Sequence, residues 1–399
     1  MPTNITMPAT HSPSTVAVVA PHGDLTPTVR DLTSKGWNAV AVTLPSHTQP
    51  LAATDPTPHD TYAEVIAHGS ARRTLARLHR HHTSAVVAGS AAGVELADTL
   101  AARLEVAGGG DPATSSARCD RGEQAAALAA AGLAAPRSLR TTSLLTALRW
   151  ARFCQLSAYV LAPADTSVAG PARLCRTQAD LSLAWRALRR AARRQSGNGH
   201  LVLQEALAGG QYLVHTVTRG GRHQVGEIWA ETRTNGVTDR LDAVPSSGML
   251  ARALRFAMLP ILDALGVQDG AYRSRIAYTP GRGPTLLSAR LEPSQTLLAL
   301  TGTPVPAPPR AQLPTTQVAL IAPHDGVIDP GRFRALTSSL STLSRILGPL
   351  HAGCAVARTV SRLTSPGTLI LTGGSHAIAE DYRRIRRLEA DGLYARSAS

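Results

Sequence analysis

Short apolar runs alternate with amphipathic, helix-like segments over the first hundred residues. The runs VAVVA (16–20), WNAVAVTL (37–44) and SAVVAG (84–89) are rich in valine and alanine. Runs of this kind, apolar on both faces, are typical of buried parallel strands. A helix-like pattern covers residues 63–80, and the glycine turn after the third run opens another helix at Gly93. The pattern predicts an N-terminal α/β domain of three or four parallel strands.

Strands and helices keep alternating through the middle of the chain. An alanine-rich helix is expected to follow Asp120 and to stop at Gly132, and the pair Gly220-Gly221 predicts a hairpin turn between two alternating strands. Further helices are predicted at 143–154 and 248–267, and further strands at 158–163, 201–205, 272–280 and 284–293. The strand at 158–163 leads into a loop, ADTSVAGPA (164–172), of the kind that often covers phosphates.

The last quarter of the chain begins with a proline-rich segment. Residues 301–316 contain five prolines and are predicted to form a linker. Beyond it, VALIAPHDG (318–326) echoes VAVVAPHGD (16–24), with a strand, a glycine turn and then a helix. One short echo does not make a repeat architecture, but it predicts that a small α/β module closes the chain.

The charge of the chain is strongly basic, yet its distribution argues against a nucleic-acid partner. The formal net charge is +14, and Lys35 is the single lysine among 41 basic residues, a skew that fits mutational bias. The arginine run at 186–194 lies on a helix-like pattern whose apolar positions Leu183, Ala187 and Leu188 face the other way, which is typical of a solvated helix face. Aromatic residues make up 4% of the chain, so no stacking platform for bases is visible.

Other composition signals narrow the location of the protein. No stretch of 18 apolar residues occurs and the first fifteen residues lack a signal-peptide pattern, so we expect no membrane partner and a cytoplasmic location. The four cysteines form no C-x-x-C pair, which argues against a disulfide framework or a zinc site and favours reduced thiols in the core.

Four segments, in order and at suitable spacing, resemble the ATP-grasp superfamily, especially bacterial ligases that join a carboxylate, often an amino acid, to an amine. They are VVAGSAAGVELADTLAARL (86–104), LVLQEALAGGQYLVHTVTRGGRH (201–223), ILDALGVQDGAY (261–272) and GPTLLSARL (283–291). Such enzymes phosphorylate the carboxylate with ATP and magnesium, and the amine then displaces the phosphate.

The resemblance implies a mixed α/β fold with α+β elements. Its parts are an N-terminal pre-ATP-grasp α/β domain at 1–112, a central two-lobed ATP-grasp module at 113–300, the proline-rich linker at 301–316 and a small C-terminal α/β module at 317–399.

The sequence departs from the family at three catalytic positions. The phosphate-binding lysine falls at Ala162, and the two glutamates that hold magnesium fall at Arg275 and Leu286. The glycine-rich loop is also poorer in glycine and stiffened by Pro163 and Pro171. Magnesium prefers carboxylate oxygens, and an arginine in a ligand position repels it.

Other positions match the family. Gln204 and Glu205 fall at its adenine hinge, Gln211 replaces the glutamate that binds ribose, and Arg290 matches an arginine that contacts phosphate. For each of them, a polar residue at a strand end that faces solvent is an equally good interpretation.

Compensation for the lost groups has a few candidates. Glu292 is a weak candidate for a magnesium ligand, with Asp269 as the other nearby carboxylate, and Arg173 or Arg275 could take part of the phosphate charge.

Two functions remain open. Losses on three separate elements favour a degenerate, weakly active or inactive ligase relative that acts with a protein partner or a second copy of itself and needs no cofactor. The alternative is an active ligase with relocated magnesium ligands that uses ATP, magnesium and a small carboxylate substrate. In the first case we expect Arg275 and Arg290, on adjacent strands, to attract an anion without metal.

Overall fold

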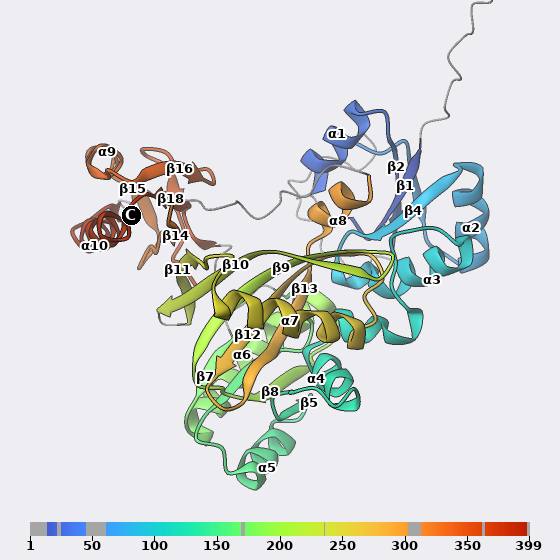
Figure 1. Cartoon of the computed structure of the whole chain (residues 1–399), viewed down its shortest axis with the longest axis horizontal. Helices are drawn as coiled ribbons and strands as arrows, with labels where there is room; N and C mark the ends of the chain where they lie inside the picture. Colours follow the sequence, from blue (N-terminus) through green and yellow to red (C-terminus); the bar gives the residue numbers. More distant parts are fainter. Residues whose placement is uncertain are drawn as a thin grey trace, which may run out of the picture.

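The computed structural model describes residues 14–21, 25–44, 61–168, 172–234, 236–301, 313–360 and 364–396. Most of the predicted linker lies outside the described residues, as does the end of the predicted phosphate loop, including Pro171. Figure 1 shows three parts: the N-terminal part mainly in blue and cyan, the central part from teal through green and yellow to orange, and the C-terminal part in orange and red.

The N-terminal part is built on a sheet of four parallel strands, as predicted. Its order is β3-β2-β1-β4, and every neighbouring pair is parallel. The strands are β1 (Thr15–Val19), β2 (Asn38–Thr43), β3 (Glu64–Ala67) and β4 (Thr83–Ala88), and the helices are α1 (Thr26–Ser34), α2 (Ala71–Arg80) and α3 (Val94–Leu104). All five residues of β1 are buried, which explains its apolar run.

The helix predicted at 63–80 is wrong over its first residues. Residues 64–67 form the edge strand β3, and α2 begins only at Ala71. Ser70 caps α2 because its hydroxyl accepts a hydrogen bond from the Arg73 amide at 3.4 Å. The cap fixes where the helix starts and leaves the Val65-Ile66 pair to extend the sheet.

The chain returns to the N-terminal part late in the sequence. Helix α8 (Pro293–Leu300) follows the last central strand and lies beside α1 in Figure 1. Its Leu297 is fully buried in one core with Val16 and Val18 of β1. The N-terminal and central parts therefore share a packed interface.

The smaller sheet of the central part is antiparallel. It runs β5-β8-β6-β7, with β5 (Ser138–Thr141), β6 (Tyr159–Pro163), β7 (Arg173–Cys175) and β8 (Leu201–Glu205). Helices α5 (Leu144–Cys154) and α6 (Gln178–Ser196) pack against it.

The buried face of α6 differs from the predicted one. Leu188 is buried as expected, but Leu183 is 84% exposed and Ala187 is exposed too. The residues that face the sheet together with Leu188 are Leu181, Trp185 and Ala192. The arginines of the run at 186–194 lie outside this buried stripe, as a solvated helix face requires.

The larger sheet has eight antiparallel strands in the order β13-β12-β9-β10-β11-β14-β18-β16. Its central strands are β9 (Gly210–Arg219), β10 (Arg222–Thr234), β11 (Val237–Ala243), β12 (Gly270–Thr279) and β13 (Gly283–Leu291). Helices α4 (Arg121–Ala130) and α7 (Met249–Ala264) contribute to a core on one face with Val214, Ile276 and Leu286. The predicted hairpin turn is confirmed, since Gly220 and Gly221 join β9 to β10 with φ of +51° and +72°.

The C-terminal part extends the larger sheet with three of its strands and forms a separate three-stranded sheet with three others. Strand β14 (Thr315–Ala319) pairs with β11, and β18 (Thr368–Thr372) and β16 (Leu343–Leu347) follow it, all antiparallel. The other elements are α9 (Pro330–Ser339), α10 (Ser375–Ala390), β15 (Gly326–Ile328), β17 (Ala355–Val356) and β19 (Tyr394–Ala395). The parallel sheet around β1 therefore has no counterpart around β14, despite the sequence echo.

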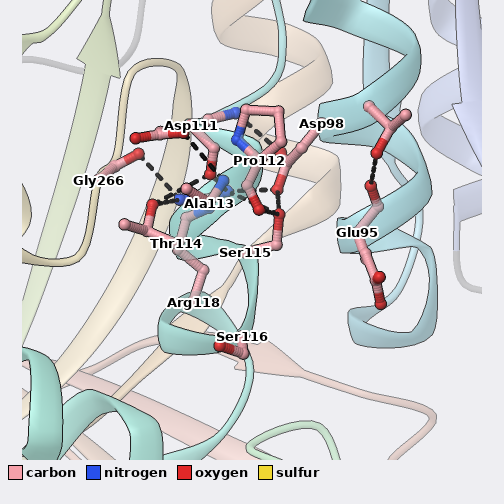
Figure 2. A network of polar contacts seen from close by, with 12 residues as sticks. Glu95, Asp98, Asp111, Pro112, Ala113, Thr114, Ser115, Ser116, Arg118 and Gly266 are labelled. Atoms are coloured by element: carbon pink, nitrogen blue, oxygen red, sulfur yellow. Dashed lines mark hydrogen bonds and ion pairs between the residues drawn. The ribbon is translucent and has the colours of Figure 1, made fainter.

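A buried arginine joins the N-terminal part to the central part (Figure 2). Arg118 forms an ion pair with Asp98 of α3 and donates to the carbonyl oxygens of Leu265 at 3.1 Å and Gly266 at 2.9 Å, just after α7. The Arg118 side chain is 1% exposed and that of Asp98 is 5% exposed. This network connects three segments that lie far apart in the sequence.

The four cysteines are unpaired, as expected, although only Cys175 is buried and the other three are partly exposed. Within the described ranges, none of the helices has the length and apolar character needed to cross a membrane.

Candidate functional site

The two faces of the larger sheet differ in character. Ile276 and Leu286 face the α7 core, whereas Arg273 and Arg275 alternate with the buried positions of β12 and so lie on the other face. Strand register places Gln211 of β9 directly beside Glu231 of β10 on this second face. We call this second face the polar face. Several of its residues are candidates that the sequence analysis named.

An ion pair dominates this polar face. Arg275 forms a two-point contact with Glu231, from Nε to Oε2 at 2.8 Å and from Nη2 to Oε1 at 3.1 Å. The Glu231 side chain is 0% exposed, and the Thr238 hydroxyl also donates to Oε1 at 2.6 Å. Burial raises the pKa of the Glu231 carboxyl, but Arg275, Arg233 and the hydrogen bonds outweigh it, so this pKa lies below its usual value and the group is charged at neutral pH.

A second arginine reaches the same place from α4. Arg121 Nη1 donates to the carbonyl oxygens of Pro163 at 2.5 Å and Asp165 at 2.9 Å, directly beyond the end of β6. Burial first, and then the neighbouring Arg275 and Arg290, lower the pKa of Arg121 to about 10. Arg121 therefore keeps its charge at neutral pH, close to Ala162, where the resemblance expects a lysine.

Arg290 completes a group that we call the arginine cluster: Arg121, Arg275 and Arg290. Arg290 lies opposite Arg273 in the β12–β13 register and is partly buried. Within the described part of the chain, its side chain has no hydrogen bond or ion pair. Arg275 and Arg290 therefore lie on adjacent strands, as expected. Both act electrostatically on Arg121.

The two carboxylates considered as metal ligands are engaged elsewhere. Glu292 Oε1 lies 2.9 Å from Arg273 Nη2, and its side chain is 25% exposed. Asp269 accepts hydrogen bonds from the amides of Gly220 at 3.0 Å and Gly108 at 3.3 Å. Among the described residues, no group of three or more His, Cys, Asp or Glu side chains is arranged to hold a metal ion.

The residues matched to the nucleotide end lie at the join of the two central sheets. Gln204 is buried, and its Nε2 lies 3.5 Å from the Leu287 carbonyl oxygen of β13. Glu205 is held by Arg282, whose Nη1 lies 3.1 Å from both carboxylate oxygens. Gln211 Oε1 is buried and accepts no hydrogen bond from any described residue. An unpaired buried acceptor of this kind suits a ligand hydroxyl.

Two predicted positions do not join the contacts of the arginine cluster. Arg173 is an exposed residue of the edge strand β7. Leu286 is 2% exposed and packs in the α7 core, so it does not face the arginine cluster. A bulge explains this: Arg275 pairs with Ser288 but Ile276 pairs with Leu286, which leaves Leu287 as an extra residue and turns Leu286 to the core face.

Two residues of the site were missed in the sequence. Glu231 belongs to the strand EIWAE, where a carboxylate on a β-strand gives no sign of a buried partner 44 residues away. Arg121 directly follows Asp120, the residue that caps α4. Its position in the first turn of a helix gives no sign of a role in the site.

The overall architecture matches known structures closely, although no protein-family model and no curated protein matches the sequence. An L-amino acid ligase from Bacillus licheniformis matches with a TM-score of 0.64 and 12% identity over 95% of this chain and 98% of its own. A carboxyaminoimidazole ribonucleotide synthase from Aspergillus clavatus, complexed with ATP, matches with a TM-score of 0.65 and 13% identity over 95% and 99%. A biotin carboxylase from Campylobacter jejuni matches with a TM-score of 0.58 and 12% identity over 92% and 89%.

These matches span nearly the whole chain and all three parts of the fold. The protein therefore has the ATP-grasp fold, which confirms the mixed α/β fold that the resemblance implied. At this level of identity the likeness concerns the fold, and the roles of individual residues are argued below.

Proposed function

We propose that this protein is a degenerate relative of the ATP-dependent carboxylate–amine ligases, one that binds a nucleotide or another anion weakly and turns over little or no ATP. The observation that carries the proposal is the Arg275–Glu231 ion pair. A guanidinium stands where the resemblance places a magnesium ligand, and a fully buried carboxylate holds it there.

Magnesium does not fit the residues present. A magnesium site needs carboxylate oxygens around a hard cation, whereas the arginine cluster brings guanidinium groups together. Each lost charged contact is worth about 1.5–3 kcal/mol, so an arginine at position 275 and an alanine at position 162 together lower the rate by roughly two to four powers of ten.

Nucleotide binding is supported at the other end of the site. The unpaired Gln211 Oε1 provides an acceptor for a ligand hydroxyl, and Arg290 provides a cation without a partner among the described side chains. Guanidinium groups bind phosphate through two parallel hydrogen bonds and need no metal to do so.

A partner chain is part of the proposal. Met249 and Phe256 on the outer side of α7 are 87% and 78% exposed. Large exposed apolar side chains that recur on one helix favour a contact with another protein or a second copy of this chain.

Calorimetry with a non-hydrolysable ATP analogue tests the proposal directly. We expect weak binding that magnesium does not strengthen and that Arg290→Ala weakens further. Arg345→Ala, an equal loss of charge at an exposed position of β16 in the C-terminal part, is the matched control and should leave the affinity unchanged. Binding that requires magnesium would overturn the proposal.

The alternative is an active ligase with relocated magnesium ligands. Glu292 supports it, because its carboxylate lies at the end of β13 and remains a quarter exposed despite its pairing with Arg273. The substrate would then be a small carboxylate such as an amino acid.

A further inference from the structure

We propose that Glu231 is a built-in counter-ion of Arg275, which an incoming phosphate or carboxylate group displaces from it. The inference rests on the proposed function, because it assumes that the arginine cluster binds anions without metal. It adds a residue that sets how tightly such anions bind, and it names the ligand as an oxyanion that can accept two parallel hydrogen bonds from a guanidinium.

The geometry of the ion pair is that of a bound ligand. Both Glu231 oxygens accept from Arg275, at 2.8 Å and 3.1 Å, which is the two-point contact that an external carboxylate or phosphate would make. While this contact holds, Arg275 has its best donors engaged. An anion drawn in by Arg121 and Arg290 therefore competes with Glu231 for the third member of the cluster.

Glu231 has other partners that can hold it when Arg275 leaves. The Thr238 hydroxyl donates to Oε1 at 2.6 Å and does not depend on Arg275. Arg233, two residues along β10, is close enough to Glu231 to lower the pKa of its carboxyl. Its Nη2 donates to the Gly236 carbonyl oxygen, but its Nε is buried and has no hydrogen-bond partner in the described part of the chain. Since a buried carboxylate without a cation is strongly unfavourable, this spare donor makes the exchange feasible.

The exchange conserves charge pairing at each step. Before binding, Glu231 pairs with Arg275 and the Arg233 Nε is unsatisfied. After binding, Glu231 pairs with Arg233, and Arg275 joins Arg121 and Arg290 around the anion. The repulsion between Arg275 and Arg121, which contributes to the lowered pKa of Arg121, is then offset by the ligand.

The test compares anion affinities of three variants without magnesium, with inorganic phosphate and ADP as probes. Glu231→Gln keeps the shape of the side chain and removes its charge, so Arg275 is released and both probes should bind about tenfold more tightly or better. Glu227→Gln removes a carboxylate from an exposed position of the same strand and should change neither affinity. Arg233→Gln removes the receiving partner and should weaken both affinities.

The outcomes separate this inference from the proposed function. Wild-type binding of ADP without magnesium, together with equal or weaker binding by Glu231→Gln, supports the proposed function and overturns the inference. Tighter phosphate binding by Glu231→Gln, with no measurable nucleotide binding by either protein, supports the inference and contradicts the proposed nucleotide site. Should Glu231→Gln melt below the assay temperature, Arg233→Gln decides, and unchanged affinities in that variant overturn the inference.

Discussion

Replacement of Arg118 by methionine should weaken the contact between the N-terminal part and the central part and destabilise the protein. Arg118 is the point where α3, the segment before α4 and the end of α7 meet (Figure 2). Methionine fills much of the same volume but donates no hydrogen bonds. The substitution leaves Asp98, with its side chain 5% exposed, as a buried charge without its cation, and it leaves the Leu265 and Gly266 carbonyl oxygens without this donor.

The expected magnitude follows from that burial. Removing one partner of a buried ion pair costs about 3–5 kcal/mol, a large share of the roughly 5–15 kcal/mol that stabilises a typical protein. An unfolding entropy of about 2.1 cal/mol/K per residue over the 399 residues corresponds to roughly 1.2 °C per kcal/mol, so the melting temperature should fall by roughly 4–6 °C. Differential scanning calorimetry measures this shift.

An exposed pair provides the matched control. Arg137→Met removes an arginine that lies 3.9 Å from Glu205 and is 58% exposed, so its effect should stay within about 1 kcal/mol. The double variant Arg118→Met/Asp98→Asn should recover part of the loss, because no unpaired charge remains. If Arg118→Met is no less stable than Arg137→Met, the reasoning about the buried pair is refuted.

Two further predictions concern stability. Gly266→Ala should lower the free energy of unfolding in urea by more than Gly392→Ala does. Both glycines have positive φ, but an added Cβ at Gly266 would lie 2.0 Å from a threonine hydroxyl oxygen, whereas none of the described atoms lies within 4 Å at Gly392. Equal losses of stability in the two variants would contradict the packing argument. Because the pKa of Glu231 is lowered by folding, its stabilising contribution is present above the ordinary carboxyl pKa of 4.5 and is lost as the pH falls through the lower folded value. The stability difference between wild type and Glu231→Gln should therefore shrink as the pH falls below 4.5, and a gap that widens there would be inconsistent with this sign.

Local patterns were enough to predict most of the fold. The buried strand β1 and the β9–β10 hairpin follow from an apolar run and from two glycines with positive φ, and both are determined by neighbouring residues. The wrong helix prediction at 64–67 also has a local cause. A short apolar pair next to a helix cap is compatible with either a strand or a helix. The continuity of β11 with β14 depends on pairing across more than seventy residues and has no local signal.

The site was predictable only in part. The resemblance to the ATP-grasp superfamily placed Arg275 and Arg290 on adjacent strands, and the structure has them there. The same resemblance placed a metal-ligand position at Leu286, but the bulge at Leu287 turns Leu286 to the core face, and a single sequence does not reveal a bulge. Glu231 joins the polar face through a contact between strands that are not neighbours in the sheet.

Phosphate release from ATP tests the central claim most directly. The assay uses saturating magnesium and a panel of amino acids as carboxylate substrates, with wild-type protein, Glu292→Gln and Arg290→Ala compared side by side. In our account, Arg275 stands at a metal-ligand position and is paired with Glu231. We therefore expect all three proteins to release phosphate no faster than a sample without protein does, whichever amino acid is added. Robust, magnesium-dependent release by the wild type that disappears in Glu292→Gln would show that the metal ligands have moved and would contradict the account.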